Sequence, residues 1–486
     1  MPRLIDRRQF LRLSSLALPI GGLSAANQAR VNVADPVVVV GAGLAGLRAA
    51  AVLRTAGRAV VVLEARGYPG GRVRTIRAPF SDGLHAEAGA IRIPGMHQTV
   101  LRLAREHRLD LVPFGFSTGS SLVTVGGMTL RTPEQVKDAA PALRLTADEA
   151  GLTQGALLQR YVGDLPGDIG DLSPTMESYA GWRAYDRVTW PEWLRSRGAS
   201  DGAVSLMTLG GDSRGLSALY VLRQFALLRN TSQFFKIQGG MDRLPRAMAT
   251  ALGTRVRYGA AVTRLDRGAA AVGVEYIQAG RIRTIRASQV ILAIPFSTLR
   301  QIAVRPPFSS RKARAIDELS YFPATRFLLQ SRTRFWEPAG LSGTARSDQP
   351  AEIWDCTYDL PGTRGILGAT VGGEMGHSLT RMTAPQALTA GTDVVAKTFP
   401  ALREQYEKGA AIRWALEPWS RGAFAVFHPG QMTSMMPDIW RPEGRVHFGG
   451  EHTSAWMGWM EGALQSGERA AAEILSGPAA STDVSR

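Results

Sequence analysis

An arginine in an apolar segment is the first residue with the means to do chemistry. Arg92 lies in GAIRIP (89–94), between two isoleucines, which predicts that the segment is buried. A guanidinium is not buried without an anion to pair with it. Its planar fork suits a carboxylate, which can accept two parallel hydrogen bonds from it. The residues alone leave open whether this anion is a ligand or a protein carboxylate such as Glu87.

A second set of residues has the spacing of a dinucleotide site. Gly41, Gly43 and Gly46 form GxGxxG, and Glu64 follows them. Glycines allow a tight turn in which backbone N–H groups reach a pyrophosphate at a helix N-terminus. A carboxylate at the position of Glu64 accepts hydrogen bonds from a ribose. The same charge would repel the 2′-phosphate of NADP, so NAD and FAD are the two dinucleotides that fit.

The elements that must hold this loop lie on either side of it. Val37–Val40 is a continuous apolar run, which predicts a buried parallel strand. The alanine-rich stretch 44–56 predicts a helix that ends at Gly57. The apolar stretch 59–63 predicts a second buried strand with Glu64 at its tip. Strand, glycine motif, helix, strand and acid in this order predict a Rossmann-like unit.

The residues after Glu64 separate FAD from NAD. The segment EARGYPGGRVRT (64–75) resembles the FAD-binding signature of the flavin amine oxidase superfamily, with Gly70, Gly71 and Arg72 as its second glycine pair and arginine. The likeness continues in the family's order through KIQGGMDRLPRAMA (236–249), YGAAVTRLD (258–266), VILAIP (290–295) and HFGGEHTSAWMGWMEGALQSGERAAAEIL (447–475).

The resemblance implies an FAD site assembled from distant segments. No cysteine occurs in 447–475, so we expect the FAD to be held without a covalent bond to cysteine. The residues that the resemblance assigns to the cofactor are Gly41, Ala42, Gly43, Gly46, Glu64, Ala65, Arg66, Gly71, Arg72, Gly89, Ala90, Ile91, Arg92, Val262, Trp419, Gly450, Glu451, Gly458, Trp459, Met460 and Ala463.

The resemblance also implies a role for Arg92 in binding the substrate. GAIR is similar to the GAMR pattern of L-amino-acid oxidases and amino-acid 2-monooxygenases, whose arginine binds the α-carboxylate of the substrate. Trp459 matches an aromatic wall beside the substrate, and AEIWDCTYDLPG (351–362) offers Trp354 or Tyr358 as a second wall. The family usually has lysine where YFPATRF (321–327) has Arg326, and this exchange is not conservative.

The resemblance implies oxidative deamination of an L-amino acid by O2, giving a 2-oxo acid, ammonia and H2O2. Arg326 leaves open the alternative of a 2-monooxygenase, which decarboxylates the amino acid to an amide. An amine oxidase on the same fold is the third alternative, because it would use the flavin without a carboxylate clamp.

The expected fold is mixed α/β, with three domains. A discontinuous Rossmann-like FAD-binding domain comprises 34–72, 236–312 and 440–478, and a mixed-sheet substrate domain comprises 73–133 and 313–439. Residues 134–235 have helical periodicity and form an inserted helical domain, in which VSLMTL (204–209) is the one candidate strand. The same insertion holds GDSRG (211–215), a GxSxG sequence that a serine hydrolase would place between a strand and a helix.

The N-terminus predicts an export address. Residues 1–29 contain the twin arginines Arg7 and Arg8, then Phe10 and Leu11, an interrupted apolar run and small residues. This order is typical of a twin-arginine signal, which carries folded proteins to the periplasm or outside the cell. The run is too short for a membrane span of about 20 residues, so no stable membrane insertion is expected.

The bulk composition limits the other classes. There are 57 basic and 41 acidic residues, a net charge of +16, but no basic run reaches five residues. We therefore expect a solvated basic surface and no nucleic-acid partner. Cys356 is the one cysteine, and no histidine pair has metal-ligand spacing, so neither an intramolecular disulfide nor a metal site is expected. A homo-oligomer is compatible with the sequence.

Overall fold

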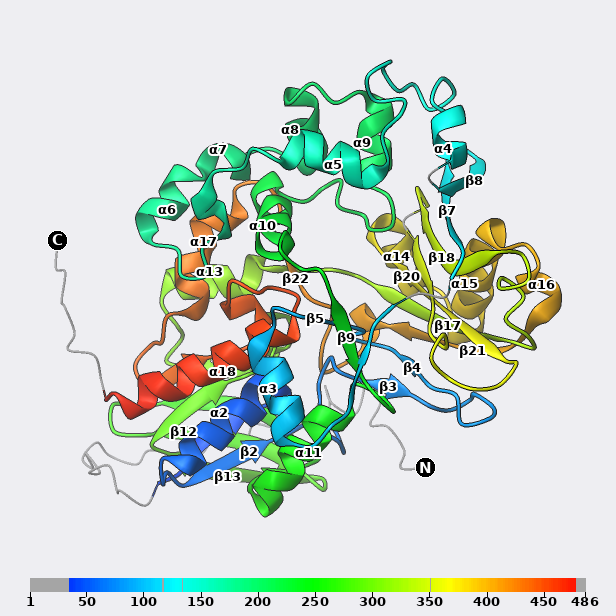
Figure 1. The fold of residues 1–486 in the computed structure, drawn as a ribbon. Coiled ribbons are helices and arrows are strands. Elements are labelled where there is room, and N and C mark those ends of the chain that lie inside the picture. The colour runs from blue at the N-terminus through cyan, green and yellow to red at the C-terminus, as the bar shows by residue number, and fades with distance from the viewer. Residues whose placement is uncertain (1–34, 116–117, 133, 350, 478–486) are drawn as a thin grey trace.

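A five-stranded parallel sheet forms the base of the molecule (Figure 1). The computed structural model describes residues 35–115, 118–132, 134–349 and 351–477. The sheet has the order β10-β2-β1-β14-β23, and all neighbouring strands are parallel. Its strands are β1 (Val37–Val40), β2 (Val60–Leu63), β10 (Val256–Arg257), β14 (Gln289–Leu292) and β23 (Val446–Phe448). The strand and helix predicted around the glycine motif are thus present, and the helix is α2 (Leu44–Thr55).

The central strand β1 is buried on both faces. Val37 and Val39 pack with apolar residues of α2 and of α18 (Met460–Leu475). Val38 and Val40 pack with β12 (Val272–Gln278), which belongs to a four-stranded sheet of order β13-β12-β11-β15. Side chains alternate across a strand, so a strand covered on both sides reads as an unbroken apolar run. The other strands of this second sheet are β11 (Ala260–Arg267), β13 (Arg281–Ala287) and β15 (Ala303–Arg305).

A seven-stranded mixed sheet forms the other half of the base, on the right in Figure 1. Its order is β21-β17-β20-β19-β18-β7-β8; β18 and β7 run parallel and the other pairs antiparallel. The strands are β7 (Ser120–Val125), β8 (Met128–Thr132), β17 (Thr325–Ser331), β18 (Leu341–Ser347), β19 (Ala351–Asp355), β20 (Gly365–Val371) and β21 (Tyr406–Arg413). Helix α15 (Ala384–Thr398) packs on this sheet through a shared apolar core.

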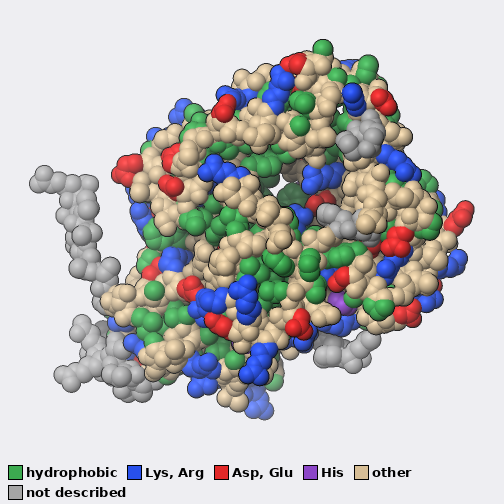
Figure 2. Space-filling view, viewed as in Figure 1, with side chains coloured by type: hydrophobic (Ala, Val, Ile, Leu, Met, Phe, Trp, Pro, Cys, Tyr) green, Lys and Arg blue, Asp and Glu red, His purple; other side chains and the backbone are tan. Residues whose placement is uncertain are grey.

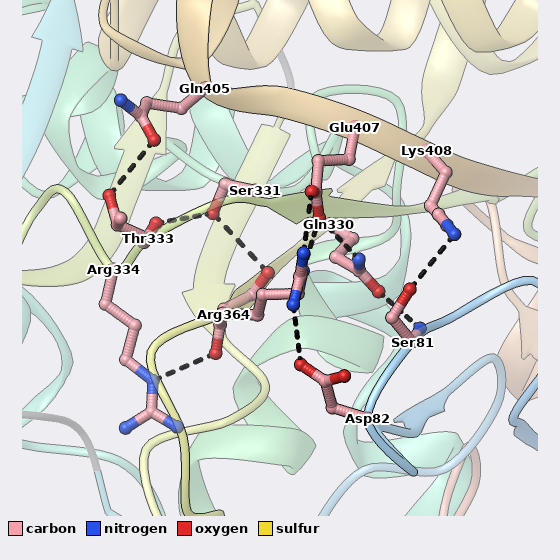
Figure 3. A network of polar contacts seen from close by, with 11 residues as sticks. Ser81, Asp82, Gln330, Ser331, Thr333, Arg334, Arg364, Gln405, Glu407 and Lys408 are labelled. Atoms are coloured by element: carbon pink, nitrogen blue, oxygen red, sulfur yellow. Dashed lines mark hydrogen bonds and ion pairs between the residues drawn. The ribbon is translucent and has the colours of Figure 1, made fainter.

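A short hairpin connects the two halves of the base. It consists of β3 (Thr75–Ile76) and β4 (Ala86–Glu87), and Arg364 fixes its loop to the large sheet (Figure 3). The Arg364 guanidinium donates to Glu407 at 2.9 Å and to Asp82 at 2.8 Å. The backbone N–H of Ser81 donates to Gln330 at 2.9 Å. Because β4 leads directly into GAIRIP, this network helps to set the position of Arg92.

A cluster of short helices covers the base at the top of Figure 1. The helices of this segment are α4 (Glu134–Asp138), α5 (Gln154–Val162), α6 (Met176–Gly181), α7 (Arg183–Asp186), α8 (Trp190–Ser196), α9 (Asp201–Met207) and α10 (Ala218–Leu228). The prediction of a strand at 204–209 is wrong, because α9 covers most of this stretch. Ser200 caps that helix by accepting a hydrogen bond from the N–H of Ala203.

The strands and helices cross the expected domain boundaries at two places. Helix α3 (Gln98–Glu106) packs in the core of the parallel sheet, although its segment was assigned to the substrate domain. Strand β9 (Phe234–Ile237) runs through the boundary at 235 and pairs with β5 (Ile93–Pro94) and β6 (Leu111–Pro113). The boundaries themselves stay a prediction.

Candidate active site

The glycine loop at the N-terminus of α2 is built to receive an anion. Gly43 is the N-cap of this helix, yet it supplies no side-chain cap, and the first turn contains no acidic residue. The first backbone N–H groups of a helix need partners from outside the helix. A Cβ added to Gly43 would meet no protein atom within 4 Å. The uncapped helix end and the open space beside it fit a pyrophosphate.

The two other glycines of the loop are required by the protein itself. A Cβ on Gly46 would lie 2.0 Å from the carbonyl oxygen of Gly41. Gly41 has a φ of +101°, and its Cβ would lie 2.8 Å from the carbonyl oxygen of Ala293. Gly41 lets the loop approach the residue after β14, and Gly46 lets helix α2 approach the loop, whereas Gly43 borders open space.

Glu64 ties the end of β2 to the loop. Its carboxylate accepts hydrogen bonds from the N–H of Ala42 at 2.7 Å and from the N–H of Arg66 at 2.8 Å. Burial raises the pKa of Glu64, although these two N–H donors oppose the shift. The carbonyl of Glu64 accepts from Ala260, so the start of β11, with Val262, lies alongside the segment that contains Ala65.

Arg66 connects this segment with the stretch around Trp419. Its guanidinium donates to Glu417 at 3.2 Å and to the hydroxyl of Ser420 at 3.3 Å. The side chain of Trp419, between these partners in sequence, is 37% exposed. Trp414 is instead buried, with its indole N–H donating to the carbonyl of Ala88 at 2.9 Å.

Arg72 and Glu451 join the second glycine pair to the C-terminal segment. Arg72 Nη1 donates to Glu451 Oε1 at 2.6 Å, and Glu451 Oε2 accepts from the N–H of Gly458 at 2.7 Å. Gly71 approaches the first loop, because its Cβ would lie 3.5 Å from the Cα of Gly43. Burial opposes ionisation of Glu451, but Arg72, His452 and the N–H of Gly458 together outweigh it, and the pKa of this carboxyl is lowered.

The turn before α18 presents an aromatic side chain from the C-terminal segment. Gly450 precedes Glu451 and donates its N–H to Ser466 at 2.9 Å. Gly458 is exposed with a φ of +77°, Trp459 is the N-cap of α18, and Met460 begins the helix. The indole N–H of Trp459 donates to Gln224 of α10 at 3.0 Å, so the helical segment reaches this turn. The N–H of Ala463 donates to the carbonyl of Trp459 at 3.3 Å.

Arg92 faces a cavity of about 600 Å³ between the seven-stranded sheet and the helical segment. The molecule is visibly hollowed between these parts in Figure 2. Gly89 and Ala90 lead into this position, and a Cβ on Gly89 would clash with the carbonyl oxygen of Arg72 at 1.8 Å. The residues around the cavity include Ile91, Arg92, Phe114, Leu122, Gln154, Leu206, Leu209, Phe234, Arg346, Glu352 and Trp354.

The partner of Arg92 is Glu352 and not Glu87. Arg92 Nη1 lies 4.0 Å from Glu352 Oε1, and the guanidinium lies 5.2 Å from the ring of Phe234. Across the described ranges, no residue accepts a hydrogen bond from the Arg92 side chain. Glu87 instead accepts hydrogen bonds from the hydroxyl of Thr75 and the N–H of Met241. Glu87 is therefore not the partner of Arg92, and the alternative of an arginine paired with a protein carboxylate now concerns Glu352.

Trp354 and Tyr358 occupy different surroundings. Trp354 lines the cavity with Arg92, and the guanidinium of Arg326 lies 4.6 Å from its ring. Arg326 also donates to the carbonyl of Glu87 at 3.3 Å, and burial lowers its pKa to about 10. The hydroxyl of Tyr358 donates to the carbonyl of Pro113 at 2.9 Å. Tyr358 is not among the residues that line the cavity.

Comparison with known proteins assigns the chain to a family. A model of the family described as "Flavin containing amine oxidoreductase" matches residues 44–475. The chain belongs to the flavin-containing amine oxidoreductase family. It is an enzyme of this family, and the predicted resemblance and fold class are confirmed.

Two relatives of this flavin amine oxidoreductase have names that refer to L-amino-acid oxidases. A protein of Bacillus subtilis (strain 168), YobN, provisionally named an L-amino-acid oxidase, is 32% identical, with 90% of this chain and 94% of that protein covered. An L-amino-acid oxidase of Echis ocellatus is 30% identical, with 90% of this chain and 88% of that protein covered.

Solved structures of two amine oxidases resemble this chain. A putrescine oxidase is 25% identical with a TM-score of 0.74, covering 91% of this chain and 99% of its own. Cyclohexylamine oxidase from Brevibacterium oxydans IH-35A has a TM-score of 0.76, with 91% and 99% covered, but its 22% identity supports only the fold.

Phe424 and His97 also lie at this site of the flavin amine oxidoreductase, although the sequence did not single them out. Phe424 lies against the turn before α18, because a Cβ on Gly458 would meet its ring at 3.7 Å, and it stacks on Phe322. The buried ring of His97 packs 5.2 Å from Trp459, and burial lowers its pKa to about 4. Nothing in the spacing of these residues indicated that they approach the turn.

The competing chemistries find no support in the described parts of the chain. GDSRG follows helix α9 rather than a strand, so Ser213 does not stand on a nucleophile elbow. Within residues 35–477, gaps excepted, no group of three His, Cys, Asp or Glu side chains could hold a metal.

No described helix is long and apolar enough to cross a membrane. The residues of the predicted export signal, 1–29, lie outside the described residues.

Proposed function

We propose that this flavoenzyme is an FAD-dependent L-amino-acid oxidase that converts its substrate to a 2-oxo acid, ammonia and H2O2. The observation that carries the proposal is Arg92, whose guanidinium faces the cavity without a hydrogen bond to any described residue. A guanidinium in this setting is a ready partner for a carboxylate. The names of the Bacillus subtilis and Echis ocellatus relatives support the same substrate class.

The proposed FAD is bound without a covalent bond. The first-turn N–H groups beyond Gly43 would hold its pyrophosphate, and Glu64 would accept from its ribose. Arg72 and Glu451 fix the two segments that meet beside it. When bound, the flavin would supply the two-electron oxidation and the reaction with O2. Cys356, the one cysteine, lies far in sequence from the turn before α18.

The residues of the cavity orient the substrate. Arg92 would hold the α-carboxylate through a two-point contact and so fix Cα relative to the rest of the site. Trp354 would provide a flat apolar surface beside it, and Phe114, Leu206 and Leu209 add further apolar lining. Trp459 is not among the residues that line this cavity, and its role as a second wall rests on the family resemblance. This lining favours an amino acid with an uncharged, bulky side chain.

Two other activities remain candidates for specific reasons. An amine oxidase is favoured by Glu352, a carboxylate in the cavity that could attract a cationic amine, and by the amine oxidases among the similar structures. A 2-monooxygenase is favoured by Arg326, which replaces the lysine usual in the family.

A product assay separates the three activities. The purified protein is incubated with a panel of L-amino acids and their decarboxylated amines, and peroxide, 2-oxo acid, amide and CO2 are measured. The proposal predicts equal amounts of peroxide and 2-oxo acid from amino acids. Amide and CO2 with little peroxide would assign a 2-monooxygenase, and a preference for the amines would assign an amine oxidase.

The proposed location is outside the cytoplasm. The twin-arginine route carries folded proteins, which suits an enzyme that must bind its flavin before export. This proposal rests on residues 1–29 of the sequence.

A further inference from the structure

The cavity contains a protein carboxylate, that of Glu352, which can compete with a substrate carboxylate for Arg92. Glu352 projects from β19, opposite Arg346 of β18 and Thr370 of β20 in the sheet register. Its carboxylate lies 4.0 Å from Arg92 Nη1, which is longer than a hydrogen bond. The two side chains are 34% and 29% exposed, so both are accessible from the cavity.

No other group of the cavity takes up the charge of Glu352. Among the described residues that line the cavity, Glu352 is the only Asp or Glu. Arg346, its neighbour across the strands, donates instead to Gln154 at 2.6 Å. Gln154 in turn donates to the carbonyl of Leu206 at 2.6 Å, which holds this acceptor in place. Glu352 therefore has no hydrogen-bonded cation, and Arg92 is the one described cation within ion-pair distance of it. The buried guanidinium of Arg326 also interacts with its charge, from outside the cavity lining.

We propose that Glu352 determines specificity by acting as the internal counterion of Arg92. The inference rests on the proposed function, in which Arg92 binds the substrate carboxylate. An incoming carboxylate must share the guanidinium with Glu352 or displace it. Two carboxylates near one guanidinium repel each other, so Glu352 weakens the binding of anionic ligands and strengthens the binding of cationic ones.

The size of the effect follows from the exposure of the pair. Water screens partly exposed charges at this distance, and such pairs change binding modestly. We expect Glu352→Gln to lower the Kd of a simple carboxylate by about two- to fivefold. Raising the salt concentration should reduce the difference between wild type and variant.

The test uses flavin-loaded holoenzyme and two probes of opposite charge. Benzoate carries the carboxylate without an oxidisable amine, and benzyltrimethylammonium is a cation with no hydrogen on nitrogen. Binding of each is followed by the change in flavin absorbance. Glu352→Gln should bind benzoate more tightly and benzyltrimethylammonium more weakly than wild type. The matched control is Glu337→Gln, because Glu337 also forms a long ion pair, 3.9 Å from Arg334, but lies outside the cavity lining.

The outcomes separate this inference from the proposed function. Unchanged or weaker benzoate binding in Glu352→Gln, with Arg92→Ala still abolishing it, would overturn the role of Glu352 alone. Benzoate binding that survives Arg92→Ala would overturn the carboxylate clamp itself. Glu352→Thr, which keeps a residue suited to a strand, should repeat the result of Glu352→Gln and guards against a folding defect in either variant.

Discussion

Arg72 and Glu451 lie 379 residues apart in the sequence, and a 2.6 Å hydrogen bond joins their side chains. Glu451 accepts three hydrogen bonds, the other two from the N–H groups of Ala425 and Gly458. One buried carboxylate therefore connects the second glycine pair, the strand before α17 (Gln431–Trp440) and the turn before α18.

Glu451→Gln should destabilise the fold and loosen the flavin. The amide offers one acceptor oxygen in place of two and leaves Arg72 uncompensated, at a cost of about 2–4 kcal/mol. Thermal unfolding and the flavin retained after gel filtration measure the two effects. Glu468→Gln is the control, because Glu468 pairs with Arg48 at 2.6 Å but is 33% exposed. It should lose less than about 1 kcal/mol of the free energy of unfolding. Equal losses in the two variants would show that the buried Glu451 pair stabilises the fold no more than an exposed pair does.

Gly43 and Gly46 should respond differently to added side chains. Gly43→Leu places its Cβ in space free of protein atoms, so the apoprotein should fold but remain colourless. Gly46→Ala drives a Cβ to 2.0 Å from the carbonyl of Gly41, and the fold itself should lose about 1–3 kcal/mol. Circular dichroism, thermal unfolding and absorbance near 450 nm distinguish the two. A yellow Gly43→Leu protein would contradict the placement of the cofactor loop.

The pH dependence of stability should include a contribution from Glu87. Burial raises the pKa of Glu87 to about 7, from a usual value of 4.5, although Met241 and Thr75 donate to it. The folded state therefore binds a proton that the unfolded state releases between pH 4.5 and 7. The contribution of Glu87 to the free energy of unfolding is therefore complete below pH 4.5, and it is lost as the pH rises to 7.

Glu87→Gln should remove this loss. Relative to wild type, the variant should gain about 2–3 kcal/mol in free energy of unfolding between pH 5 and pH 8. Denaturant unfolding at several pH values is the measurement. A constant difference between the two proteins across that range would show that Glu87 does not titrate there.

The sequence predicted those parts of the site that rest on local patterns. The strand Val37–Val40 is an unbroken apolar run because helices cover one face and a second sheet covers the other. The glycine motif is equally local, since all three of its glycines lie within six consecutive residues, 41–46. The helix after it follows from its alanine content.

The rest of the site depends on contacts that no local pattern encodes. Trp354 and Glu352 share a face of β19, whereas Tyr358 lies beyond the strand, and only the strand register separates them. Arg92 meets Glu352 of β19, a strand far away in the sequence, and the hairpin before Arg92 is joined to the same sheet by Arg364. The apolar residues of 204–209 fit the period of a strand as well as that of a helix, so the predicted strand was wrong. The N-cap hydrogen bond accepted by Ser200 stabilises the helix.

The twin arginines should control location without affecting catalysis. Replacing Arg7 and Arg8 by lysine should leave a folded, flavin-loaded and active enzyme inside the cell, because the twin-arginine route requires the pair. Fractionation of cells that express wild type and variant, with activity assayed in each fraction, is the measurement. Unchanged export of the lysine variant would show that this segment is not such a signal.

The central claim is that Arg92 binds the carboxylate of an amino acid, and Arg92→Ala tests it most directly. The measurement is the ratio of kcat/KM on an L-amino acid to kcat/KM on its decarboxylated amine, in wild type and variant with equal flavin content. Losing a charge-assisted contact worth about 1.5–3 kcal/mol and the orientation it provides should lower kcat/KM on the amino acid about 100-fold or more. Activity on the amine should change little, so the ratio should collapse. A wild type that prefers the amine, or a ratio that Arg92→Ala leaves unchanged, would contradict the account.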